Sequence, residues 1–204
     1  QTDEALLALL LRFKETLERE APLRDLDLTP EEVVAARGYR FLTLKPVLVV
    51  LNVGDQGSDN PADHVPYRHR RSDVICLRGG LEMEIAQLEP EEAALFLAEY
   101  GIPEPGLHRM IRLSYALLGL QSFFTVGEDE VRSWTVPLGA TAVDAAAAIH
   151  SDLARGFIRA EVVSYDDLMA AGSLDAARKQ GTVRLQGRDY LVKDGDILNI
   201  RFNV

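Results

Sequence analysis

The run Val47–Val53, VLVVLNV, places the strongest constraint on how this chain can fold. It consists almost entirely of β-branched residues and leucine, without the alternation of a strand that has one exposed face. Such a run is typical of a parallel strand covered on both faces. A second short strand is predicted at 74–77, and helical patterns follow at 81–101 and 107–119. This order of buried strands and helices predicts an α/β fold.

Helical patterns precede this part of the chain. Apolar residues recur at helical spacing before Ala21-Pro22, where proline ends the helix. Thr29 and Glu32 have the spacing of a capping box, with a proline in the first turn, so a second helix begins there. The first 40 residues are therefore predicted to be the end of a helical arm, which leads back to the main part of the protein. Its apolar stripe consists of Leu6, Leu10, Phe13 and Leu17.

The pattern changes near Gln121. Strands are predicted at 122–126 and 131–136, joined through 127–130, and Thr141 with Asp144 caps a following helix. An alternating strand follows at 158–165, and three short strands at 182–204 are separated by turns at Gln186-Gly187 and Asp194-Gly195. We expect an autonomous α+β roll. Its predicted apolar set is Phe123, Trp134, Ile149, Ile158, Val163, Tyr190 and Phe202.

Charge and cysteine content limit the partners and the compartment. The formal net charge is -10, so a nucleic-acid partner would need a local basic patch. The single cysteine, Cys76, rules out an internal disulfide and suits a reducing cytosol. Apolar runs are shorter than the roughly 18 residues of a membrane helix, and the N-terminus is not a signal peptide. Because position 1 is Gln rather than Met, we expect a fragment.

The residues Asn52-Val53-Gly54-Asp55 stand where α/β sheets bind ligands, at the carboxyl end of a parallel strand. In GTPases an N-K-x-D motif occupies this place. Its Asn ties neighbouring loops together, and its carboxylate accepts hydrogen bonds from N1-H and the 2-amino group of guanine. Turns rich in Asn and Asp also follow strands with no ligand at all, so this short motif leaves both readings open.

Other candidate sites are weaker. The chain contains no G-x-x-x-x-G-K-[ST] phosphate loop, so it should not hydrolyse a nucleotide alone. Its histidines lack metal spacing, and no zinc site is expected. His150-Ser151-Asp152 contains the residue types of a nucleophilic triad, but contiguous side chains diverge along a helix, and a structural role for His150 is preferred. The basic run 68–71 is interpreted as a solvated face.

Three long stretches closely resemble the C-terminal TGS domain of the YchF/Obg-like ATPase family. They read FFTVGEDEVRSWTVPLGATA, AAIHSDLARGFIRAEVVSYDDLMAAGS and GTVRLQGRDYLVKDGDILNIRFNV. The resemblance extends back through GIPEPGLHRMIRLSYALLGL to YRFLTLKPVLVVLNVGD, and more loosely before residue 40. It implies a cytoplasmic P-loop NTPase of the translation-factor class. Three parts are implied here: a coiled-coil arm segment at 1–40, the C-terminal part of a G domain at 41–120, and a β-grasp TGS domain at 121–204.

The resemblance also implies a site. Asn52, Val53 and Asp55 would contact the base of ATP or GTP, while Mg²⁺ and the phosphates would be held only in a parent protein. The next loop, Cys76 to Arg78 with Leu77 between them, would close the pocket through its backbone N-H groups. The family motif is usually N-x-x-E, whereas Asp55 is one methylene shorter and Val53 stands where GTPases have Lys. The motif therefore does not determine whether the site prefers guanine or adenine.

The leading hypothesis is the C-terminal portion of a YchF-like, ribosome-associated NTPase, carrying the base-recognition motif and a TGS docking or regulatory domain. Its expected partners are the ribosome or translation machinery and a nucleotide, with an RNA contact through the TGS domain as a further expectation and no membrane. The alternative is a stand-alone interaction module without nucleotide function. A small hydrolase using His150 and Asp152 is the least favoured hypothesis.

Overall fold

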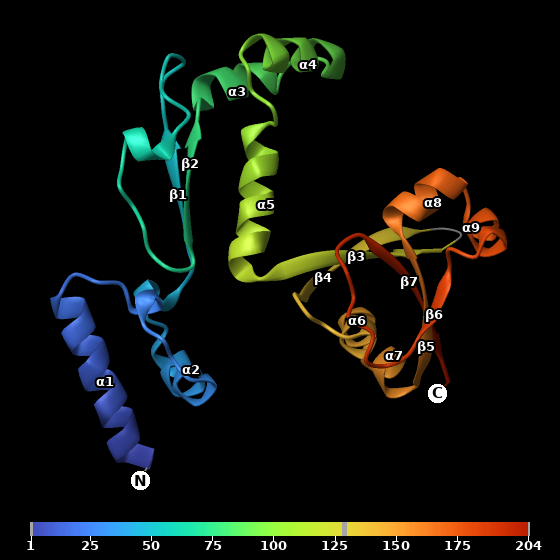
Figure 1. Cartoon of the computed structure of the whole chain (residues 1–204), viewed down its shortest axis with the longest axis horizontal. Coiled ribbons are helices and arrows are strands. Elements are labelled where there is room, and N and C mark those ends of the chain that lie inside the picture. Colours follow the sequence, from blue (N-terminus) through green and yellow to red (C-terminus); the bar gives the residue numbers. More distant parts are fainter. Residues whose placement is uncertain (1, 128–129, 204) are drawn as a thin grey trace. The chain divides into compact units, whose positions relative to one another are not determined.

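The computed structural model describes residues 2–127 and 130–203. The chain divides into two compact units, residues 1–118 and 119–204, and each is described by itself. Figure 1 shows helices around a pair of long strands in the first unit and a larger mixed sheet with helices in the second. The predicted succession of an α/β part and an α+β part is thus confirmed.

The N-terminal unit begins with a helical segment that has a small core of its own. Leu9 and Phe13 of α1 are buried against Leu23 and Ala36, and the Phe13 ring meets Phe41 edge-on at 5.5 Å. The capping box predicted at the start of α2 is present. The elements are α1 (Thr2–Glu18), η1 (Leu23–Asp25), α2 (Pro30–Ala36), η2 (Arg37–Tyr39) and η3 (Leu42–Leu44).

The apolar stripe predicted for the first helix is only partly right. Leu17 is exposed, and Leu9, which was not assigned to the stripe, is buried. The reason is the contact partner, since α1 packs against the short η1 and α2 rather than along its full length against another long helix. The face that reaches the core therefore runs through Leu9 and Phe13.

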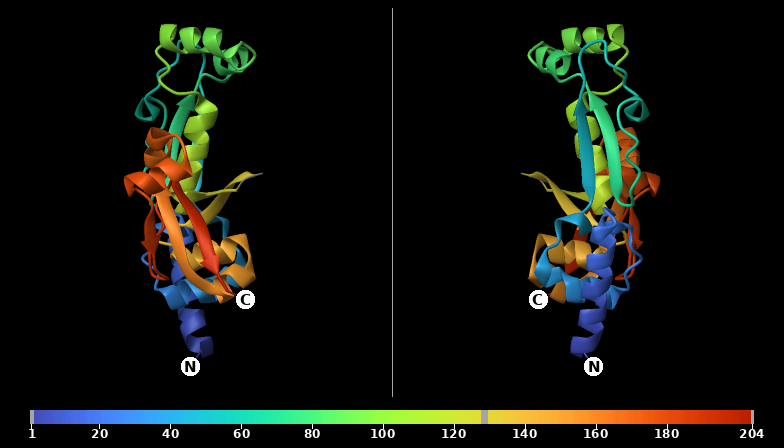
Figure 2. Two further views of the ribbon diagram at one scale, coloured as in Figure 1. Left: turned by 90° about the vertical axis from the view of Figure 1, so that its right-hand side faces the viewer. Right: turned by 90° about the vertical axis from the view of Figure 1, so that its left-hand side faces the viewer.

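A parallel pair of strands follows, β1 (Val47–Asn52) and β2 (Ser72–Leu77), joined through the short helix η4 (Pro61–Asp63). The pairing is in register from Val47 opposite Ser72 to Asn52 opposite Leu77. The expectation that the first strand is covered on both faces is wrong for this chain. Val50 is exposed, because β1 has one neighbouring strand and α5 lies along one face of the pair (Figure 2).

The predicted helices after the second strand are present as three pieces. They are α3 (Gly79–Ile85), α4 (Pro90–Glu99) and α5 (Gly106–Leu118). Pro90 stands at the start of α4, where its missing N-H is not needed for a helical hydrogen bond. Leu81 and Ile85 of α3 are buried, whereas Leu95 of α4 is exposed.

The C-terminal unit is built on a five-stranded mixed sheet with the order β4-β3-β7-β5-β6. β3 pairs with β4 antiparallel and with β7 parallel, which is the central arrangement of a β-grasp, so the expected fold is confirmed. Of the predicted turn at 127–130, residues 128 and 129 lie outside the described residues. The strands are β3 (Leu120–Val126), β4 (Val131–Pro137), β5 (Phe157–Ser164), β6 (Arg184–Gln186) and β7 (Asp196–Phe202).

Helices lie on both faces of this sheet, since the main core takes Phe123 and Val162 while a second core takes their strand neighbours Phe124 and Val163. The predicted cap of Thr141 and Asp144 opens α6 (Ala142–Ile149), and α7 (Ser151–Arg155) follows directly. Two further helices, α8 (Tyr165–Ala171) and α9 (Leu174–Gln180), were not predicted. The strand expected between the last two turns reduces to a single bridge between Thr141 and Leu191.

Two members of the predicted apolar set lie outside the core. Phe123 and Val163 are buried, and Trp134, Ile149 and Tyr190 pack against the main cluster. Ile158 and Phe202, in contrast, are exposed. Both lie on the sheet beside exposed Leu185, away from the core cluster that Phe123 and the α6 alanines form. The turn predicted before the last strand is confirmed, with Gly195 at φ 80°.

Candidate functional site

The six residues proposed from the sequence meet at the carboxyl ends of β1 and β2. Asn52 and Leu77 are the last residues of these strands and stand opposite each other. The backbone N-H of Val53 donates to the Leu77 carbonyl at 2.8 Å, which extends the pairing one step beyond β1. The loops that carry Asp55 and Arg78 therefore start side by side.

The Asn52 side chain joins these two loops. Its Oδ1 accepts a hydrogen bond from the backbone N-H of Gly79 at 3.1 Å. A Cβ at position 79 would lie 2.7 Å from that oxygen, a distance that ordinary packing does not tolerate. The contact therefore depends on glycine at position 79.

Asp55 presents an exposed carboxylate near this contact. Among the described residues it has no hydrogen-bond or ion-pair partner. A Cβ built on Gly80 would lie 4.0 Å from Oδ1 of Asp55, so the carboxylate borders the start of α3. A tight turn, in which Gly57 N-H donates to the Gly54 carbonyl at 2.7 Å, fixes the loop just after it. This carboxylate is free to accept hydrogen bonds from a ligand.

The two residues before Arg78 contribute through their backbone. Cys76 is buried, and burial raises the pKa of its thiol, so the side chain is a neutral part of the core. The Cys76 carbonyl accepts a hydrogen bond from the Arg109 guanidinium at 2.6 Å, and the Leu77 carbonyl accepts from Val53. A ligand at this edge would meet backbone groups of this loop rather than the thiol.

Arg78 is held within the protein. Its guanidinium donates to the Asp59 carboxylate at 2.7 Å and to the Tyr100 carbonyl at 3.3 Å, and only 16% of the side chain is exposed. The arginine thus ties the loop after β1 to the end of α4. These contacts position that loop.

Sequence reasoning missed two supporting residues. Glu82 accepts a hydrogen bond from the backbone N-H of Gly106, and a Cβ at position 106 would clash with both Glu82 and Leu77. Arg109, one turn further along α5, holds the Cys76 carbonyl. The sequence Pro105-Gly106 signals a helix start, but nothing in it indicates the partner.

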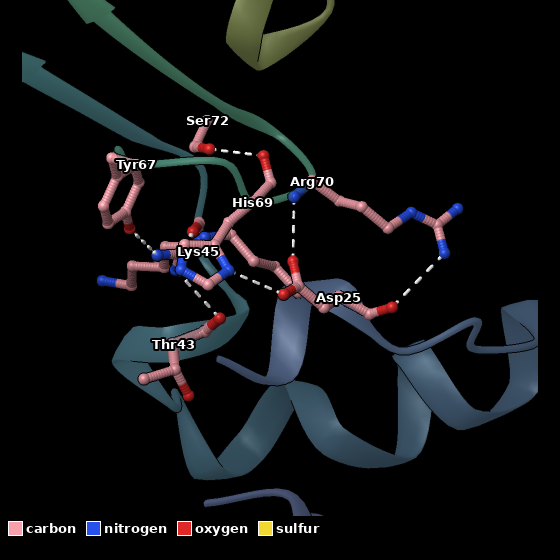
Figure 3. A network of polar contacts seen from close by, with 8 residues as sticks. Asp25, Thr43, Lys45, Tyr67, His69, Arg70 and Ser72 are labelled. Carbon is pink, nitrogen blue, oxygen red and sulfur yellow. Dashed lines mark hydrogen bonds and ion pairs between the residues drawn. The ribbon is translucent and has the colours of Figure 1, made fainter. Parts of the chain in front are cut away.

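Two weaker candidates have structural contacts. His150 ends α6 and caps α7, with its Nδ1 accepting from the Asp152 backbone N-H at 3.2 Å, as a helix-end histidine would. In the basic run, His69 and the Arg70 backbone both bind Asp25, at 2.7 and 2.8 Å (Figure 3). That run therefore joins the helical segment to β2, and its interpretation as a solvated face alone is incomplete.

The described residues offer no site for a metal ion and no membrane span. No group of three or more His, Cys, Asp or Glu side chains within 2–127 and 130–203 could hold a metal. In the same ranges, none of the helices is both long and apolar enough to cross a bilayer.

Known proteins resemble this chain along nearly its whole length. Residues 120–203 match the family YchF-GTPase_C, described as a protein of unknown function (DUF933). The "Ribosome-binding ATPase YchF" of Pasteurella multocida is 43% identical over 206 residues, covering 97% of this chain and 56% of the relative. The protein of the same name from Bacillus subtilis is 44% identical over 203 residues, covering 96% and 56%.

A solved structure shares the fold. The YchF GTPase of Schizosaccharomyces pombe superposes with a TM-score of 0.78 at 28% identity, covering 95% of this chain and 53% of that one. The chain thus spans about half the length of the relatives that it matches.

Proposed function

This chain belongs to the YchF family, matching the C-terminal portion of its members, and we propose that it supplies the base-recognition part of a nucleotide-binding site. Asn52, Val53 and Asp55 contact the base of ATP or GTP in this proposal. The backbone from Cys76 to Arg78 closes the other side.

The hydrogen bond from Gly79 to Asn52 is the observation that carries this proposal. It holds two loops together at the edge where parallel sheets bind ligands, and it leaves Asp55 exposed beside them. A preformed frame of this kind lowers the ordering cost of binding. An ordinary surface turn has no need for a glycine at position 79 that admits an asparagine oxygen.

The proposed site should discriminate only weakly between adenine and guanine. A carboxylate in the base plane accepts the N1-H and 2-amino donors of guanine, and each well-placed charged hydrogen bond adds roughly 1.5–3 kcal/mol. Adenine lacks both donors, but Val53 provides no lysine stem to cover a base and Asp55 has a short reach. We expect ATP and GTP to differ by less than about tenfold, or about 1.4 kcal/mol.

The residues that would bind and hydrolyse the triphosphate are not among those of the proposed site. The sequence has no G-x-x-x-x-G-K-[ST] loop to hold a triphosphate, and its four lysines do not follow a glycine. The chain by itself should therefore show no ATPase or GTPase turnover. Steady turnover that survives purification and is lost in Asp55→Asn would contradict this.

The C-terminal unit is proposed as a ribosome-docking module, because the relatives are named ribosome-binding ATPases. A hollow lined by residues of β5, β6 and β7 offers a surface for this. Ile158, Leu185 and Phe202 are exposed there, and the arginines at 159 and 201 line the same hollow. Exposed apolar side chains with neighbouring arginines suit a contact with RNA or protein. Such a partner implies a cytosolic location.

Ligand-observed NMR tests the base site. Saturation transfer from the intact chain to AMP and GMP should give signals for both base rings, which Asp55→Asn weakens. Asp189→Asn, an exposed carboxylate in the other unit, is the matched control and should leave the signals unchanged. If AMP and GMP give no base signals, the alternative of an interaction module without nucleotide function is favoured.

A further inference from the structure

A cavity of about 520 Å³ lies in the N-terminal unit, away from the strand ends that carry the candidate base site. It is bordered by η1, α2, η3 and the turn before β2. Eight of its fifteen lining residues are apolar, among them Leu23, Leu44 and Phe41. Its volume falls within the range of about 300–1,000 Å³ typical of small-molecule sites.

Cations surround this apolar floor. Six of the lining residues are Arg or Lys, against one acid, Asp27, in a chain whose net charge is -10. Asp27 is already paired with Arg70. Among the described residues, Arg37, Arg40 and Arg71 have no carboxylate within 4.0 Å. Unpaired arginines gathered around one cavity create a positive field that favours an anion.

A buried cation also lines the cavity. Arg24 is 8% exposed, and its guanidinium donates to the Tyr67 hydroxyl at 2.6 Å and to the Thr43 carbonyl at 3.1 Å. Its Nε is buried and has no hydrogen-bond partner. The hydrogen bonds fix this buried charge beside the cavity, where it adds to the positive field of the other cations.

The backbone is strained at the same place. Arg40 and Arg71 adopt left-handed conformations, with φ 52° and 48°, and both line the cavity. A residue with a Cβ adopts this conformation at a cost, and such strain concentrates at functional sites. The one other described non-glycine residue with positive φ is Glu20, which lies in the turn after α1 and does not line the cavity.

The walls are fixed by contacts between segments distant in sequence. Asp25 lies between His69 and Arg70 (Figure 3), and Arg24 links η1 to the segment before β1. The cavity is therefore largely formed before a ligand arrives, which favours binding.

We propose that this cavity binds a small amphiphilic anion, with an apolar body on the leucine and phenylalanine floor and a phosphate or carboxylate among the arginines. The two features together select this class. An inorganic anion would leave the apolar floor unused, and a neutral apolar molecule would leave the cations unpaired. The phosphates of a nucleic acid could contact the arginines, but a nucleic acid has no apolar chain to pack against the leucine and phenylalanine residues of the cavity.

Decyl phosphate, kept as a monomer, is the probe for calorimetric titration of the intact chain. We expect saturable binding with one site, at least roughly tenfold tighter than decanol or inorganic phosphate because both parts contribute. Equal affinity for decanol, or for inorganic phosphate, would overturn the proposal. Binding only to vesicles of phosphatidylcholine with phosphatidic acid, or only to a short RNA, would overturn it as well.

Two sets of variants, each with its own control, locate the site without depending on stability. Arg40→Gly and Arg71→Gly should each weaken decyl phosphate binding roughly threefold to fivefold, as expected for one ion pair near a surface, while leaving the melting temperature unchanged or higher. Glu20→Gly relieves the same backbone conformation elsewhere and should leave affinity unchanged. Val33→Trp should obstruct the mouth and reduce binding, whereas Val34→Trp, on the neighbouring exposed residue that does not line the cavity, should not. Equal affinity for all variants would place the ligand elsewhere and reject this site.

Discussion

Asn52 Oδ1 accepts a hydrogen bond from Gly79 N-H at 3.1 Å, and this contact leaves no room for a side chain at position 79. Gly79→Ala should therefore destabilise the N-terminal unit, although alanine is the better helix former. Gly80→Ala should stabilise it by about 0.5–1 kcal/mol, because a Cβ there meets nothing closer than 4.0 Å. Urea unfolding of the two variants provides the comparison. Equal effects would mean that the Asn52 contact does not constrain position 79.

Tyr190 should titrate far above the usual range of tyrosine. Burial, and then the hydrogen bond from its hydroxyl to Asp196 at 2.8 Å, raise its pKa to about 12 from an ordinary 10. The folded state keeps the proton after the unfolded state has lost it. Stability is therefore fully present below pH 10 and decreases up to about pH 12, by at most about 2.7 kcal/mol at 1.36 kcal/mol per pKa unit. Ultraviolet titration of the wild type and Tyr190→Phe measures this, and a tyrosine spectrum complete by pH 11 in the folded protein would contradict it.

Glu161 should make the C-terminal unit sensitive to acid. Burial raises the pKa of this carboxyl, but hydrogen bonds from Arg201 and Arg178 outweigh burial and lower it overall. A lowered folded pKa means that the stabilisation is present above the ordinary value of 4.5 and is lost as the pH falls below it. Glu161→Gln should cost about 1–3 kcal/mol at pH 7 and flatten the pH dependence of unfolding.

The matched control for that experiment is Asp175→Asn. Asp175 also pairs with Arg178, at 3.0 Å, but is largely exposed. Its loss should change stability by less than about 1 kcal/mol. A pH dependence that Glu161→Gln leaves intact would show that another carboxylate is responsible.

The C-terminal unit should fold without the rest of the chain. Its two core clusters, centred on Phe123 and Val163, draw on residues after 119 only. A segment of residues 119–204 should give cooperative thermal unfolding and dispersed amide signals. Random-coil signals from this segment would mean that its core requires the N-terminal unit.

Sequence patterns that span only a few residues, such as helix caps and turns, predicted much of the fold. The caps at Thr29 and Thr141 and the turn at Gly195 were readable because both partners lie close together in sequence. Helices α8 and α9 were missed, although Ser164 and Ser173 cap their starts and a left-handed glycine ends each of them. Both are seven residues long, too short for a periodic pattern to stand out.

Long-range contacts could not be predicted. The strand ends that bring Asn52 beside Leu77 follow from the parallel pairing expected of the two runs. In contrast, the links from Asp25 to His69 and from Arg78 to Asp59 join residues 19 or more positions apart, and charge alone does not select such partners. The exposure of Ile158 and Phe202 was missed for a related reason, since the alternation of a strand does not reveal which of its residues the helices cover.

Amide chemical-shift mapping of the intact chain with AMP and GMP tests the central proposal most directly. Shifts should concentrate at residues 52–55 and 77–80, with apparent affinities for the two nucleotides within about tenfold of each other. Asn52→Ala should reduce them, while Asn60→Ala, which removes an amide side chain from the exposed loop that follows, should not. Shifts confined to other regions, or a hundredfold preference for GMP, would contradict the base-recognition site proposed here.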